Sequence, residues 1–296
     1  MSERWLITGA LGCIGAWTCA TLVREGVPVT AFDLGDDLRR LRLIATPREI
    51  DDIDFVRGDL TEAGTVERVL AEREITHVVH LAALQVPFCR ANPVLGSQVN
   101  VTGTIDVFEA VKRQGLTTTL AYASSAAVYD ERGDIAPTTL YGVTKVANEG
   151  AARIYADESG IASVGLRPFT VYGPGRDQGL TAGPPLAIAA AVRGEPCRIA
   201  FGGRTQLHYA GDAARAFVQA ARSEPGGAEV YNLGGESTAI ADFAALVQAA
   251  IPGAEITHED APLPFPPELP RPWVDSPLTP LEDGIRETVE AFRRVV

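Results

Sequence analysis

Tyr141 and Lys145 are the two side chains of this sequence best spaced for moving a proton. They stand four positions apart, so a helix presents both on one face. A tyrosine with an unperturbed pKa of about 10 is a poor base near neutral pH, and a neighbouring ammonium group that stabilises the phenolate makes it a usable one. Such pairs are common and usually structural. Ser124 and Ser125 strengthen the case for catalysis, because they follow an apolar run at residues 118–123 and α/β sheets place reactive groups where strands end.

Short apolar runs alternate with helical patterns over the first two-thirds of the chain, and these elements would position the reactive side chains. Residues 139–158 read as the helix that carries Tyr141 and Lys145, and residues 92–114 read as another helix. Six runs read as strands: 4–8, 27–32, 53–56, 77–81, 118–123 and 162–166. Strands that alternate with helices form right-handed crossovers, so we expect an α/β fold with a Rossmann-type doubly wound parallel sheet.

The alternation of apolar runs and helical patterns becomes irregular after Arg167, where glycines and prolines interrupt the chain. We expect residues 1–166, together with about 207–233, to form a nucleotide-binding domain, and residues 167–206 and 234–296 to form a small C-terminal substrate lobe. Residues 262–280 hold 8 of the 20 prolines, which predicts an extended arm. A closing amphipathic helix is expected at residues 281–296.

A glycine-rich turn joins the first expected strand to the first helix. Gly9, Gly12 and Gly15 stand around Cys13 and Ile14. Glycine is needed where the chain turns tightly, where backbone approaches a diphosphate and where the helix packs on the strand. The helix N-terminus then presents free N–H groups to the phosphates. The placement predicts a dinucleotide site at these five residues, although a glycine turn can also be no more than a tight turn.

Asp33 ends the second expected strand, 18 residues after Gly15. A carboxylate there would accept hydrogen bonds from both adenosine ribose hydroxyls and would repel a 2′-phosphate, which favours NAD over NADP. Arg39 and Arg40 follow closely enough to keep NADP open as the alternative. Asp59 and Leu60 follow the third strand, where the Asp59 carboxylate would either accept from the adenine amino group or cap a helix.

Composition excludes several classes of function. The net charge is −12 and no basic run is interleaved with aromatic residues, so we expect no nucleic-acid partner. The longest apolar stretches, such as residues 186–192, are too short to cross a bilayer, so we expect no membrane association and a cytoplasmic location. The four cysteines and four histidines lack metal-ligand spacing, which predicts reduced thiols and no metal site.

Seven signatures occur in one order along nearly the whole chain: TGALGCIG, Asp33, HLAAL, NVTGT, SSAAVY, YGVTK and RPFTVYGPGR. In type and spacing they resemble the extended short-chain dehydrogenase/reductases, the NAD-dependent epimerase/dehydratase family. The resemblance implies that Ser125 holds the substrate oxygen, with Ser124 beside it, and that Tyr141 exchanges the proton. It also implies that Lys145 binds the nicotinamide ribose and lowers the tyrosine pKa while a hydride moves to or from NAD. Further residues implied at the cofactor are Leu81, Ala82 and Ala83 as lining, Asn100 as structural support and Pro168 against the nicotinamide.

The resemblance is weakest at the substrate. Nucleotide-sugar enzymes of this family have an asparagine where this chain has Thr170, and a diphosphate-binding arginine where it has Thr205, with Arg204 one residue out of step. The short segments between Ser125 and Tyr141 and before the last helix would also shrink the substrate lobe. These departures favour a smaller sugar or sugar acid, although Arg271 resembles the second phosphate-binding arginine of the family. The candidate substrate contacts, each of which could equally be a surface or interlobe residue, are Arg176, Gln206, His208 and Arg271.

Three functions remain open on this basis. A sugar dehydrogenase and a sugar epimerase share the oxidation step, and a UDP-sugar 4-epimerase is the alternative with a larger substrate. A non-catalytic protein that senses NAD(H) is a remote alternative, because it would not need an intact set of Ser125, Tyr141 and Lys145. The resemblance also implies a homodimer formed by the outer faces of helices 92–114 and 139–158, whose apolar residues could otherwise be core.

Overall fold

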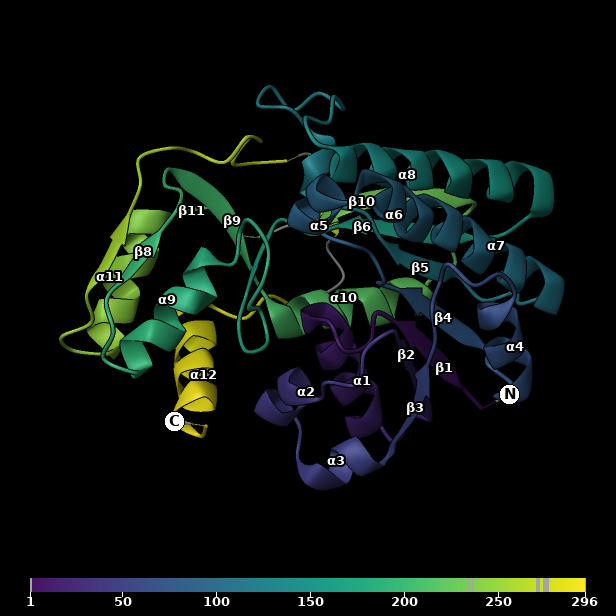
Figure 1. Ribbon diagram of the computed structural model, residues 1–296, viewed down its shortest axis with the longest axis horizontal. Coiled ribbons are helices and arrows are strands. Elements are labelled where there is room, and N and C mark those ends of the chain that lie inside the picture. Colours follow the sequence, from purple (N-terminus) through teal and green to yellow (C-terminus); the bar gives the residue numbers. More distant parts are fainter. Residues whose placement is uncertain (1, 234, 236, 270–271, 274–276, 296) are drawn as a thin grey trace.

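A computed structural model describes residues 2–233, 235, 237–269, 272–273 and 277–295 (Figure 1). Its largest feature is a sheet of eight strands in the order β13-β10-β6-β5-β4-β1-β2-β3, and every described pair of neighbours is parallel. The bounds are β1 Trp5–Thr8, β2 Val29–Asp33, β3 Ile53–Arg57, β4 His77–His80, β5 Leu120–Ala123, β6 Ser163–Arg167, β10 Ala228–Leu233 and β13 Pro272–Trp273. The predicted doubly wound parallel sheet is therefore confirmed. The strand order reverses between β1 and β4, and such a switch point leaves a crevice at the carboxyl ends of the strands.

Helices cover both faces of this sheet (Figure 1). On one face lie α1 (Cys13–Arg24) and α10 (Ala210–Arg222), and on the other lie α4 (Thr65–Glu72), α7 (Gly103–Gln114) and α8 (Leu140–Ser159). Successive residues of β1 serve opposite cores, since Leu6 packs on the second face and Ile7 on the first. Strands that are buried on both faces explain the continuous apolar runs in the sequence.

The helix expected at residues 92–114 is interrupted. It divides into α6 (Pro93–Ser97), a π-helical turn at Gln98–Thr102 and α7. The carbonyl of Asn100 accepts from Thr104 Oγ1 at 2.7 Å and from Asn148 Nδ2 at 2.9 Å. These side-chain donors compete for a carbonyl that would otherwise serve the helix, and π-helical turns of this kind often lie at functional sites.

The lobe beside the large sheet is built from small sheets and three helices. Its strands are β7 (Thr170–Tyr172), β9 (Arg204–Tyr209) and β11 (Ser237–Ala239) in one sheet, and β8 (Cys197–Ile199) and β12 (Ile256–His258) in another. Its helices are α9 (Gly183–Val192), α11 (Ile240–Ala250) and α12 (Leu281–Arg293), which share a core around Ile188, Phe243 and Ile285. The arm at residues 262–280 contributes β13 to the large sheet, although the sequence placed it in the lobe. The exact domain boundaries stay a prediction.

Four short helices complete the large domain: α2 (Arg39–Ile44), α3 (Pro47–Asp51), α5 (Val86–Ala91) and a 3₁₀ turn at Ala126–Val128. Among the residues described above, none of the helices is both long and apolar enough to cross a membrane.

Candidate active site

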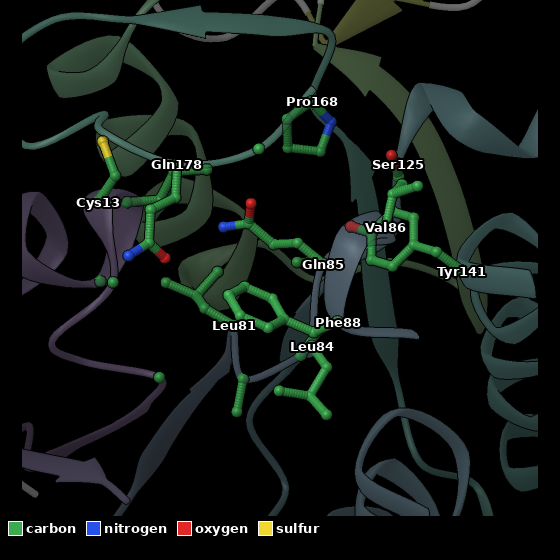
Figure 2. A pocket seen from close by; sticks show the side chains of 18 of the residues that line it. Cys13, Leu81, Leu84, Gln85, Val86, Phe88, Ser125, Tyr141, Pro168 and Gln178 are labelled. Carbon is green, nitrogen blue, oxygen red and sulfur yellow. The ribbon is translucent and has the colours of Figure 1, made fainter. Parts of the chain in front are cut away.

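A cavity of about 570 Å³ lies at the carboxyl ends of the central strands. Its wall is formed by the glycine turn after β1, the ends of β2 and β5, the loops after β3, β4 and β6, and the first turns of α8. Figure 2 shows Cys13 and Gln178 on one side of it and Ser125 and Tyr141 on the other. The cavity therefore joins the predicted dinucleotide site to the predicted catalytic residues.

The glycine turn leaves no space for side chains. Gly9 has a φ of +67°, and a Cβ there would come within 2.7 Å of the backbone nitrogen of Ala82. A Cβ at Gly15 would lie 2.2 Å from the carbonyl oxygen of Gly9. Gly12 is the N-cap of α1 and has no side chain with which to cap it, so the first N–H groups of the helix stay open to a ligand. These residues fit the diphosphate of a dinucleotide.

Asp33 is held at the cavity wall by backbone donors. Its Oδ2 accepts from Leu11 N at 2.9 Å and its Oδ1 from Gly35 N at 3.1 Å. The nearby arginines are turned to another carboxylate: Arg40 Nη2 lies 2.7 Å and Arg39 Nη2 lies 2.8 Å from the carboxylate of Asp177. Arg39 also pairs with Asp37 at 3.0 Å and Arg40 also donates to the Leu11 carbonyl, so the donors of both guanidiniums are engaged by groups other than Asp33. This arrangement favours NAD over NADP.

Asp59 caps a turn rather than a helix. Its Oδ1 accepts from the backbone nitrogen and from the hydroxyl of Thr61, each at 2.8 Å, whereas α4 begins only at Thr65 behind Gly64. The helix cap that the sequence left open is therefore not seen. Asp59 and Leu60 both line the cavity, and their contact with an adenine ring stays a prediction.

Tyr141 and Lys145 lie in the first two turns of α8, whose N-cap Thr139 accepts from Gly142 N at 3.1 Å. A Cβ at Gly142 would lie 2.1 Å from the carbonyl oxygen of Ala127, so a glycine is required for the helix to approach the segment after β5. That approach brings the side chains of Ser125 and Tyr141 to the same side of the cavity (Figure 2). Lys145 Nζ lies 5.4 Å from the centre of the Tyr141 ring and donates to the Ala123 carbonyl at 2.7 Å.

Burial dominates the titration of this pair. It raises the pKa of Tyr141, and the hydrogen bond from Ser125 and the charge of Arg176 act in the opposite direction. Burial also lowers the pKa of Lys145 from 10.5 to about 8. With a pKa of about 8 the Lys145 side chain is still mostly an ammonium group at neutral pH, and that it lowers the pKa of Tyr141 stays a prediction.

Ser124 faces a buried ion pair. Its hydroxyl donates to Glu149, which also accepts from Arg167 through two bonds of 2.6 and 2.7 Å. Arg167 donates further to the hydroxyl of Tyr129. Although Ser124 lines the cavity, its hydroxyl is engaged by Glu149 and anchors the end of β5.

Asn100 lies behind the cavity wall. Its Oδ1 accepts from Leu84 N at 2.7 Å, and its Nδ2 donates to the Leu84 carbonyl at 3.0 Å and to Thr144 at 3.3 Å. It therefore ties the loop after β4 to the helix that carries Tyr141 and Lys145. This position agrees with the structural role that the resemblance implies.

The structure brings most of the predicted site residues to one cavity. Besides those already placed there, the lining includes Leu81, Ala82, Ala83, Pro168 and Arg176. Thr170, Gln206 and His208 lie outside that lining, in β7 and β9 of the lobe. Arg271 lies outside the described residues.

The polar residues of β7 and β9 offer no cation toward the interior. Thr170 and Thr205 bond each other through their hydroxyls at 2.8 Å. Arg204 is exposed and donates to Ser237. Burial lowers the pKa of His208 to about 4, so this side chain is neutral at physiological pH. Among the described residues of these two strands, nothing replaces the diphosphate-binding arginine of nucleotide-sugar enzymes.

Apart from Arg176, sequence reasoning missed the loop at residues 175–181 as part of the cavity wall, and it also missed Gln85. Gln85 follows the HLAAL signature directly, which is a local signal for a lining role. The loop contains two glycines and follows Pro174, but no pattern indicates that it returns to the glycine turn.

Comparisons with known proteins agree with this geometry. UDP-glucuronate 4-epimerase 3 of Arabidopsis thaliana is 33% identical over 185 residues, which cover 57% of this chain and 42% of that protein. The chain thus spans less than half the length of the Arabidopsis relatives it matches. UDP-glucose 4-epimerase of Mycolicibacterium smegmatis is 28% identical and is matched over 98% of both chains.

A solved UDP-glucose 4-epimerase of Thermus thermophilus in complex with NAD superposes with a TM-score of 0.79 at 28% identity, over 99% of this chain and 100% of that chain. The model of the NAD dependent epimerase/dehydratase family matches residues 5–234. The predicted resemblance is confirmed, and this chain belongs to the NAD dependent epimerase/dehydratase family.

Proposed function

We propose that this chain is an NAD-dependent oxidoreductase that oxidises a carbinol carbon of a sugar or sugar-acid substrate, as a dehydrogenase or as an epimerase. One observation carries the proposal: a single cavity holds the glycine turn, Asp33 and the set of Ser125, Tyr141 and Lys145. NAD is the cofactor of the family, as the sequence predicted.

Each residue has a defined task in this reaction. NAD, when bound, supplies the hydride acceptor and a positively charged ring. Asp33 and the glycine turn hold its adenosine ribose and diphosphate. Ser125 holds the substrate oxygen, and the phenolic oxygen of Tyr141 takes the hydroxyl proton. Lys145 donates one of its three N–H bonds to Ala123, which leaves two for the ribose hydroxyls.

The substrate class rests on the lobe. A diphosphate needs fixed cationic partners, and Thr170, Thr205 and Arg204 do not supply them. A small sugar or sugar acid is therefore the first candidate. Of the substrate contacts predicted from the sequence, Ser125 and Arg176 line the cavity, whereas Gln206 and His208 lie outside its lining. A UDP-sugar 4-epimerase is the second candidate, because the relatives named above carry that activity in their names. The intact catalytic set argues against a protein that only senses NAD(H).

A panel of free sugars, sugar acids and UDP-sugars tests the proposal, with NADH absorbance and isomer interconversion measured for each compound. NADH formation from a small substrate identifies a dehydrogenase, whereas interconversion without net NADH identifies an epimerase. Turnover of UDP-sugars alone would reject the small substrate. A chain that binds no NAD would reject the oxidoreductase altogether.

We also propose a homodimer through α6 and α8. Val94 and Leu95 of α6 and Val143 and Ile154 of α8 are exposed, and the two helices contact each other. Exposed apolar side chains on adjoining helices suit a self-complementary two-fold interface. Light scattering tests the proposal, and a monomeric mass would reject it.

The four cysteines are free thiols, which is in keeping with a reducing compartment such as the cytoplasm.

A further inference from the structure

A loop between β7 and α9, residues 173–181, passes over the glycine turn, and we call it the strap. Trp17 of α1 donates to the Pro174 carbonyl at 3.0 Å. Asp177 binds Arg40 at 2.7 Å, and Arg40 in turn donates to the carbonyl of Leu11 at 2.8 Å. The Sγ of Cys13, in the glycine turn, donates to the same Pro174 carbonyl at 3.9 Å. The strap is thus fastened to the large domain on the side where the glycine turn lies.

Arg176 extends from the strap into the cavity wall with donors to spare. Its Nη2 donates to Thr181 at 3.2 Å, whereas its Nε is buried without a partner. No described carboxylate pairs with it, in contrast to Arg39 and Arg40, which share Asp177. A buried donor of a charged group that lacks an acceptor is unfavourable, so this guanidinium is suited to an anion that enters the cavity.

The charge of Arg176 reaches both ends of the dinucleotide path. Burial raises the pKa of the Cys13 thiol, at the start of α1, and that of the Tyr141 phenol, and the charge of Arg176 acts against the rise in both. Arg176 lines the same cavity as the helix N-terminus, where a diphosphate would bind, and the catalytic tyrosine. An anion near the entry of α1 would be in its reach.

Gln85 converges on the same space from the loop after β4. Its Oε1 is buried and has no partner among the described residues. A Cβ at Gly179, whose φ is +102°, would come within 2.5 Å of Gln85 Oε1 and 2.9 Å of Arg176 Nη2. Glycine at this position therefore leaves room for both side chains to point into the cavity.

We propose that Arg176 binds the diphosphate of NAD from the side opposite the glycine turn, with Gln85 beside it. The proposal rests on NAD as the cofactor and moves Arg176 from the substrate to the cofactor. A diphosphate carries two negative charges, whereas the N-terminus of α1 offers only about half a positive charge. A guanidinium fork matches phosphate oxygens in geometry and supplies the missing charge.

Calorimetric titration of NAD and ADP-ribose, together with ligand-observed NMR of adenosine, tests this assignment. We expect Arg176→Gln to weaken NAD and ADP-ribose on the order of 10- to 100-fold, the effect of one charge-assisted hydrogen bond, and to leave adenosine unchanged. Arg176→Lys keeps a positive charge, so its affinities for NAD and ADP-ribose should lie between those of the native chain and those of Arg176→Gln. The matched control is Arg42→Gln, which removes an exposed arginine of α2 outside the cavity lining and should leave all three ligands unaffected.

Two results would overturn the assignment. Unchanged affinity of Arg176→Gln for NAD and ADP-ribose would do so, including the case in which only the KM of an anionic substrate rises. An equal loss of adenosine affinity would also do so, because it would mean that the strap had merely lost its structure. A native chain that fails to bind NAD would instead reject the proposed function, so the two failures are distinguishable.

Discussion

Lys145 offers a quantitative test of the catalytic site. It is one of two lysines in the chain, is buried among apolar and polar groups beneath Tyr141, and has its pKa lowered from 10.5 to about 8 by that burial. The difference of about 2.5 pH units, at about 1.4 kcal/mol each, is roughly 3 kcal/mol. Between pH 8 and 10.5 the unfolded chain keeps a proton that the folded chain has lost. The free energy of unfolding should therefore rise with pH across this window on account of Lys145.

The variant Lys145→Met removes the titration and preserves the length of the side chain. Between pH 7 and pH 10.5 the native protein should gain roughly 3 kcal/mol of unfolding free energy relative to Lys145→Met, because only the native protein contains the titrating lysine. Urea denaturation of both proteins at several pH values measures this difference. Lys112→Met is the matched control, because it removes the other lysine of the chain from a position that is 49% exposed on α7. Parallel curves for the native protein and Lys145→Met would refute the burial argument.

Three further substitutions test the site and its support. Tyr141→Phe should lower turnover on the order of 10²- to 10⁴-fold with NAD affinity intact in calorimetry, and retained turnover would remove Tyr141 from catalysis. Gly15→Ala should weaken NAD binding much more than Gly12→Ala, since the added Cβ meets backbone at 2.2 Å rather than 3.1 Å; equal affinities would contradict this geometry. Arg167→Met should destabilise the protein by about 3–5 kcal/mol in urea denaturation, because it leaves Glu149 buried and unpaired. Adding Glu149→Leu should recover most of the lost stability. Losses that simply add in the double variant would show that the pair is not coupled.

Local patterns predicted the large sheet and the reactive pair. Each of the six expected strands lies within two residues of an observed one, because a strand buried on both faces leaves a continuous apolar run. Tyr141 and Lys145 were predictable together because four positions along a helix place side chains on one face. Close backbone contacts in the glycine turn, such as that of Gly15 with Gly9, leave no room for a side chain. Glycine is therefore required at these positions, and its spacing made the turn predictable from the sequence.

Contacts between distant segments could not be read in the same way. Trp17 and Pro174 are 157 residues apart, so no spacing rule connects the strap to the glycine turn. Thr170 occupies a position that the family uses for substrate, but its side chain pairs with Thr205 on a neighbouring strand. The π-helical turn at Gln98–Thr102 depends on donors from Asn148, which lies on another helix. Each of these features is decided by tertiary packing rather than by local preference.

The difference between a dehydrogenase and an epimerase depends on whether the cofactor stays bound after oxidation. A dehydrogenase must release NADH, whereas an epimerase must keep it so that the hydride can return. The strap could contribute to retention through its anchors, since Asp177 accepts from Arg40, which is only 17% exposed, and Trp17 donates to the Pro174 carbonyl. The pair of Asp177 with Arg39, which is 53% exposed, adds at most about 1 kcal/mol. Retention would then depend on these anchors together with the diphosphate contacts within the cavity, that is, on the glycine turn and Arg176.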